Sequence, residues 1–139
     1  MKVANLRSPY DKTSGIVYFG RMLDKIRLHA QGKLPKDYHE NLGKGFDERC
    51  LKFLKVGYPE LIERVKLGGT DQEILDWCFA NGRKPSEEDI EVWNEFLRKR
   101  GWNDEMSERL LIRKKEIGAE NRNDIQSFFD FIDADEGRK

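Results

Sequence analysis

The 139-residue sequence is poor in cysteine, histidine and proline, with two, two and four residues respectively, and it has no long apolar run. Cys50 and Cys78 form neither a disulfide framework nor a metal-type CxxC pair, which indicates a reducing compartment. No segment approaches the roughly 18 apolar residues that cross a bilayer, and the basic Lys2 is followed by no signal-peptide core. The sequence therefore predicts a cytoplasmic protein without membrane association.

Charged residues make up 37% of the chain and balance to a net charge of zero. Residues 1–70 carry 14 Lys and Arg against 8 Asp and Glu, whereas residues 71–139 carry 12 against 18. One interpretation is that the two halves pack on each other and attract, or that charges of both signs are solvated on different faces. The other is that the basic half binds an anionic ligand or an acidic protein. Nucleic acid is disfavoured, because the densest basic clusters, 98–100 and 113–115, lie beside glutamates in the acidic half.

The pattern of apolar residues predicts an all-α fold. Leu, Ile, Val and Phe form about a quarter of the chain, enough for one globular domain. Apolar residues at three- and four-residue steps, with glycine stops, predict helices over 15–30, 47–55, 59–67, 70–80, 86–100, 104–117 and 123–132, and one turn near 37–42. We expect a single compact domain over residues 1–139, with six or seven short helices packed orthogonally and a frayed tail at 133–139.

Polar residues mark the starts of several predicted helices. Asp47 and Asn123 are the expected N-caps of their helices. The segments 70–73 and 86–89 have the spacing of a capping box, in which two side chains bond reciprocally to the backbone.

The first predicted helix carries charges along the border of its apolar stripe. At about 100° per residue, Gly20, Asp24 and Arg27 share one flank, with Arg21 and Lys25 further round toward solvent. Asp24 and Arg27 are spaced to form an ion pair, and the glycine lets another segment or a ligand approach the backbone. This is either an ordinary boundary ion pair beside a close crossing, or an anion site in which Asp24 fixes the Arg27 guanidinium.

The loop 34–47 is a second candidate region. It brings Tyr38, His39 and Lys44 before a helix N-terminus, whose free amides favour negative charge. The sequence around Lys44 lacks the GxxxxGK[ST] pattern of a P-loop, so a plain loop is the alternative. If the protein is an enzyme, His39 or His29 is the expected general base, because histidine titrates near about pH 6.5.

Cofactor patterns are missing. The histidines and cysteines have no metal-ligand spacing, and the chain has no GxGxxG or GxSxG segment. The sequence therefore predicts no cofactor and no metal.

Several short segments together resemble a known family: Leu6-Arg7-Ser8-Pro9-Tyr10, Gly20-Arg21-Met22-Leu23-Asp24-Lys25, Gly32-Lys33-Leu34-Pro35-Lys36-Asp37-Tyr38, Gly45-Phe46-Asp47, the Gly69-Thr70-Asp71 region and Trp77. Over nearly its whole length the chain resembles a bacterial family of domains of unknown function, numbered 5069. The resemblance implies a small, free-standing, soluble bacterial protein, and it supplies no activity, cofactor or catalytic residue.

We therefore expect a helical module that binds a small anion or an acidic surface through six residues: Arg21, Asp24, Arg27, Tyr38, His39 and Lys44. One alternative is a small enzyme in which His39 or His29 moves a proton next to Arg27, on a substrate with a carboxylate or phosphate. Another is a homodimer through an exposed apolar patch on Phe128, Phe129 and Ile132. Both ligand hypotheses require the first helix and the segment 38–44 to share a cavity.

Overall fold

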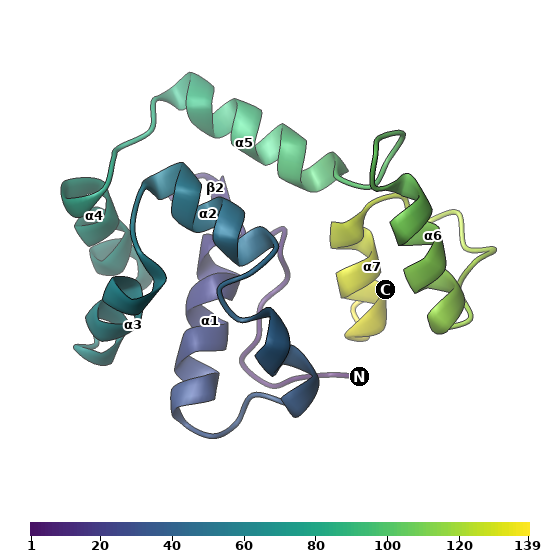
Figure 1. The fold of residues 1–139 in the computed structure, drawn as a ribbon, viewed down its shortest axis with the longest axis horizontal. Helices are drawn as coiled ribbons and strands as arrows, with labels where there is room; N and C mark the ends of the chain where they lie inside the picture. Colours follow the sequence, from purple (N-terminus) through teal and green to yellow (C-terminus); the bar gives the residue numbers. More distant parts are fainter.

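Seven α-helices, one 3-10 helix and a two-stranded antiparallel sheet make up the computed structural model, which describes residues 1–139 (Figure 1). In chain order the elements are β1 (Lys12–Thr13), β2 (Ile16–Val17), α1 (Phe19–Ala30), η1 (Lys36–Asn41), α2 (Phe46–Leu54), α3 (Tyr58–Lys66), α4 (Asp71–Asn81), α5 (Glu87–Lys99), α6 (Ser107–Glu116) and α7 (Phe128–Asp135). The prediction of a helical fold is confirmed in its main point. The turn predicted near 37–42 is the 3-10 helix η1. The sheet was not among the predicted elements, and orthogonal packing stays a prediction.

The first helix was predicted to begin at residue 15, but residues 15–17 belong to a β-hairpin. Ser14 and Gly15 both have a positive φ, which reverses the chain between the strands. Ile16 and Val17 are fully buried in strand β2. The burial of these two β-branched side chains outweighs the helical spacing, and Tyr18, in a left-handed conformation, is the N-cap of α1.

Both predicted capping boxes are present. The Thr70 hydroxyl accepts a hydrogen bond from the amide of Glu73, whose carboxylate accepts one from the amide of Thr70. Ser86 and Asp89 make the same reciprocal pair at the start of α5. These contacts span three residues, so local sequence suffices to predict them.

The two single N-caps were predicted wrongly. Helix α2 begins at Phe46 after the N-cap Gly45, which places Asp47 inside its first turn. Helix α7 begins at Phe128, and the hydroxyl of Ser127, not the side chain of Asn123, caps it by accepting from the amide of Asp130.

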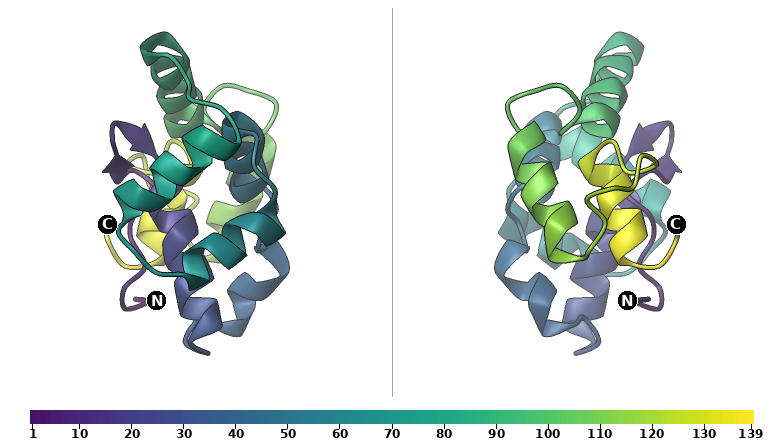
Figure 2. Two further views of the ribbon diagram at one scale, coloured as in Figure 1. Left: turned by 90° about the vertical axis from the view of Figure 1, so that its left-hand side faces the viewer. Right: turned by 90° about the vertical axis from the view of Figure 1, so that its right-hand side faces the viewer.

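Helix α1 lies at the centre of the main hydrophobic core, and α2, α3, α4, α5 and α7 surround it (Figures 1 and 2). Of the 18 buried residues in this core, the helix supplies Phe19, Met22, Leu23 and Ile26. Burial of each large aliphatic or aromatic side chain contributes roughly 1.5–3 kcal/mol. Because α1 is covered from several sides, its charged residues must find partners within the protein.

The end of the chain packs against this core rather than fraying. Helix α7 extends to Asp135, and the next residue, Glu136, is only 4% exposed. Phe129 is fully buried, while Phe128 and Ile132 are half-buried. Residues 133–136 of the predicted frayed tail are therefore helical or buried, whereas 137–139 are exposed, and the apolar patch named as the dimer contact is only partly exposed.

Candidate functional site

A cavity of about 440 Å³ lies between α1, η1, the start of α2, and helices α6 and α7. The aromatic side chains that line it are Tyr18, Tyr38, Phe46, Phe128 and Phe131, and the cationic side chains are Arg21, Lys25, Lys44 and Arg113. Helix α1 and the segment 38–44 thus share a cavity, the arrangement on which both ligand hypotheses depend. The buried cations Arg21 and Lys25 form its inner surface, whereas Lys44 and Arg113 are exposed.

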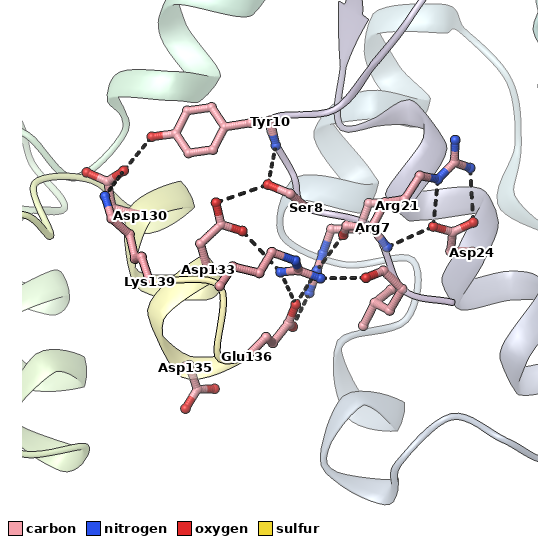
Figure 3. Close-up of polar contacts among 12 residues, drawn as sticks. Arg7, Ser8, Tyr10, Arg21, Asp24, Asp130, Asp133, Asp135, Glu136 and Lys139 are labelled. Carbon is pink, nitrogen blue, oxygen red and sulfur yellow. Dashed lines mark hydrogen bonds and ion pairs between the residues drawn. The ribbon is translucent and has the colours of Figure 1, made fainter. Parts of the chain in front are cut away.

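Arg21 is held at this inner surface by a bidentate ion pair with Glu136 (Figure 3). Its Nη1 and Nη2 atoms donate to Oε1 and Oε2 of Glu136 at 2.8 and 2.7 Å. The hydroxyl of Tyr38 donates to the same carboxylate at 2.7 Å, and Arg138 donates to it at 2.6 Å. Burial alone would raise the pKa of Glu136, but its bonds with Arg21 hold that pKa below its usual value.

Lys25 is the second buried cation, one helical turn after Arg21. Its Nζ atom lies 2.8 Å from Oδ1 of Asp47 and donates to the hydroxyl of Tyr18 at 3.1 Å. The tyrosine hydroxyl in turn donates to Asp47 at 2.6 Å, and the amide of Gly43 donates to the other carboxylate oxygen at 3.0 Å. Burial lowers the pKa of Lys25, although Asp47 opposes this shift. The sequence prediction that Arg21 and Lys25 face solvent is wrong.

Asp24 and Arg27 face a separate, open hollow and belong to a different network. Nε and Nη2 of Arg7 donate to the two carboxylate oxygens of Asp24, at 2.9 and 3.0 Å. Arg7 and Arg27 also both pair with Asp71, at 2.6 and 2.7 Å. Arg27 is 3.8 Å from Asp24, so Asp71 is its nearer partner. Two arginines therefore balance two aspartates. The guanidinium of Arg27 is paired with Asp71 and does not form the predicted anion site with Asp24.

Gly20 was predicted to let another segment or a ligand approach the backbone of the helix, and the side chain of Arg7 occupies that position. A Cβ atom at this position would lie 2.8 Å from the central guanidinium carbon of Arg7. Arg7 also donates to the backbone oxygen of Gly20 at 3.1 Å. The glycine thus admits Arg7 against α1, which matches the boundary ion pair and not the anion site.

The two histidines lie outside the cavity. The rings of His29 and His39 meet edge to face with centroids 4.8 Å apart, and His39 bonds to the backbone oxygen of Leu34 at 2.9 Å. Neither side chain borders the cavity that holds Arg21 and Lys44. The six predicted site residues therefore fall in three places: Arg21, Tyr38 and Lys44 at the cavity, Asp24 and Arg27 at the open hollow, and His39 beside His29.

Sequence reasoning missed three of the charged residues that organise the cavity. For Lys25 the sequence did hold a signal, because it lies four positions after Arg21 on the same helix and therefore on the same side. Asp47 was assigned as a helix cap, and Glu136 was placed in a frayed tail. Their partners are 22 and 115 residues away, and no local pattern encodes such pairs.

Two further observations concern metal ions and membranes. No group of three or more His, Cys, Asp and Glu side chains is close enough to hold a metal ion. None of the helices combines the length and the hydropathy that crossing a bilayer requires.

Comparison with known proteins assigns the chain to a family. The model of the family described as Domain of unknown function (DUF5069) matches residues 3–138, so the chain belongs to that family and the resemblance seen in the short segments is confirmed. Comparison with curated proteins gives no match.

Proposed function

Because a family of unknown function assigns no activity to its members, we propose from the geometry of the cavity that this protein binds a small organic anion with an aromatic or otherwise apolar body. The observation that carries the proposal is the convergence of aromatic and cationic side chains from five helices and an intervening loop on one cavity of about 440 Å³. Cavities of this size accommodate small molecules, which a few polar groups orient within an apolar lining.

Lys44 is the cation that supports recognition of the anion. Arg21 and Lys25 are already neutralised by Glu136 and Asp47, and Arg113 pairs with Glu116 at 3.0 Å. Lys44 is exposed and takes part in none of the ion pairs of the structure. The carboxylates of Asp37, Asp135 and Glu136 also line the cavity, but none of them pairs with Lys44, so its ammonium group is available to a carboxylate or phosphate that enters.

The aromatic lining favours a ligand with a flat or apolar body. Tyr38 comes from η1, Phe46 from the start of α2, and Phe128 and Phe131 from α7, so they face the cavity from different directions. Rings in such positions bury the ligand surface and allow edge-to-face contacts with it. A concave aromatic surface suits a small molecule better than the acidic face of a protein, which remains the alternative partner.

The proposal is tested by titrating the isotope-labelled protein with benzoate and phenyl phosphate and following backbone and side-chain NMR signals. Benzylamine, which has the same ring and the opposite charge, is the control ligand. We expect the two anions to shift signals of Phe46 and Phe131, and Lys44→Ala to weaken their binding about tenfold or more, the effect of one charge-assisted hydrogen bond.

Lys36→Ala is the matched control variant, because Lys36 is an exposed lysine of η1 that does not line the cavity. Its affinity for benzoate should equal that of the unchanged protein. Equal binding of benzylamine, an equal loss in both lysine variants, or the absence of any shift around the cavity would each refute the proposal.

A further inference from the structure

The buried amine of Lys25 has a position that anion binding alone does not explain. It lines the same cavity as Lys44, yet only 7% of its side chain is exposed. Asp47 lies 2.8 Å from its Nζ atom and the hydroxyl of Tyr18 lies 3.1 Å from it. A ligand held by Lys44 would therefore meet a lysine amine at the inner surface, next to a carboxylate and a phenol.

We infer that Lys25 forms a reversible imine with an aldehyde or ketone group of the anion that the cavity binds. This inference rests on the proposed function and adds the chemical class of the ligand, an anionic carbonyl compound. A lysine amine is a nucleophile toward carbonyl carbon only in its neutral form, so the reaction needs a nearby proton acceptor. Asp47 is such an acceptor, within hydrogen-bond distance of the amine.

The reaction balances with groups that are present. The ammonium of Lys25 passes one proton to Asp47, and the freed nitrogen pair attacks the carbonyl carbon, so that a C–N bond forms and the C=O π pair moves to oxygen. That oxygen takes the proton from Asp47 and a second proton from the nitrogen, and it leaves as water while the C=N bond forms. The product is a protonated imine with the charge of the original ammonium, and no oxidant or reductant is consumed.

The surroundings of Lys25 favour the neutral amine more than those of an exposed lysine. Burial lowers the pKa of Lys25, and the positive charge of Arg21 acts in the same direction. A purely structural ion pair gains little from burial, because desolvation of both charges offsets their attraction and apolar replacements are often equally stable. An amine that reacts must instead be kept both partly desolvated and within reach of a cavity.

The experiment uses the unchanged protein, 4-carboxybenzaldehyde as the probe and sodium cyanoborohydride to reduce any imine to a stable amine. Peptide mass spectrometry then locates the adduct. We expect at least tenfold more adduct at Lys25 than at the exposed Lys36, suppression of the Lys25 adduct by benzoate, and less of it with benzaldehyde, which lacks the carboxylate. Protein unfolded in urea should lose the preference for Lys25.

Two variants make the assignment independent of any one mutation. Lys25→Arg keeps the charge and cannot form an imine, and Lys25→Met removes the charge and the amine. Either variant, when circular dichroism shows it folded, should lose the adduct that benzoate suppresses. Adduct at Lys36 or Lys44 with Lys25 unmodified would overturn the imine. If benzoate still shifts the cavity signals in that case, anion binding stands, and if it does not, both proposals fall.

Discussion

Arg21 and Glu136 form a two-pronged ion pair across the protein, although 115 residues separate them in the chain. Both side chains are at most 5% exposed. The pair joins the first turn of α1 to the residue that follows α7, and it fixes two sides of the candidate cavity relative to each other. Its geometry makes the carboxylate of Glu136 as important for the shape of the cavity as any residue that faces a ligand.

Replacement of Glu136 by glutamine should destabilise the protein strongly. Glu136→Gln leaves the guanidinium of Arg21 buried without a counter-charge, and loss of one partner of a buried pair costs about 3–5 kcal/mol. Urea unfolding followed by circular dichroism measures the change in the free energy of unfolding. Glu63→Gln is the control, since Glu63 is an exposed partner of Lys66, and a loss of similar size there would contradict the assignment.

Acid should unfold the protein partly through the same residue. The folded state holds the pKa of Glu136 below its usual value of 4.5, so below that pH the unfolded chain takes up a proton that the folded state does not. The free energy of unfolding should therefore decrease as the pH falls from 4.5. In Glu136→Gln the decrease should be shallower, and urea titrations at several pH values between about 6 and 3 compare the two slopes. Parallel slopes would show that Glu136 does not couple stability to pH.

At high pH the four tyrosines should resist ionisation. Burial raises the pKa of Tyr10 and of Tyr58 to about 12, and it raises the pKa of Tyr18 and Tyr38 further. Above the usual value of 10 the folded state retains protons that the unfolded chain loses, so the free energy of unfolding should fall as the pH rises. Phenolate absorbance measures this, with protein in urea as the control. A phenol that ionises near its usual pKa in folded protein would contradict the burial.

Gly82, which ends α4, should not tolerate a side chain. A Cβ atom there would overlap the backbone oxygen of Leu54 and lie 2.7 Å from that of Lys55. Gly82→Ala must push α4 away from the end of α2, and we expect a loss of about 2–3 kcal/mol in thermal or urea unfolding. Gly57→Ala is the matched control, because its Cβ would meet only the flexible end of Glu60. Equal stability of the two variants would disprove the contact.

The parts of the fold that were predicted from sequence depend on neighbours in the chain. The capping boxes at Thr70 and Ser86 involve partners three residues away, and the helices that follow them begin where expected. The hairpin before α1 was missed because Ile16 also fits the helical spacing, and only its burial in the assembled core decides between strand and helix. Local pattern therefore predicts an element when tertiary packing does not compete with it.

The candidate site shows the same limit. Arg21, Tyr38 and Lys44, three of the six predicted site residues, line one cavity, and each stands out by residue type within its own segment. Which cation remains free for a ligand depends on Asp47 and Glu136, whose contacts form only when distant helices meet. Residue type thus indicated where charge gathers, and only the packed structure distinguishes paired from unpaired charge.

The long separation between Arg21 and Glu136 also bears on how the protein is made. Phe129 and Glu136 complete the surroundings of α1, yet the ribosome synthesises them about a hundred residues after that helix. The charged side of α1 must stay hydrated, or be held by transient partners, until those residues emerge from the exit tunnel. Translation should therefore yield a fully folded chain only after residue 136 has left the ribosome, and stalled shorter nascent chains should remain sensitive to protease.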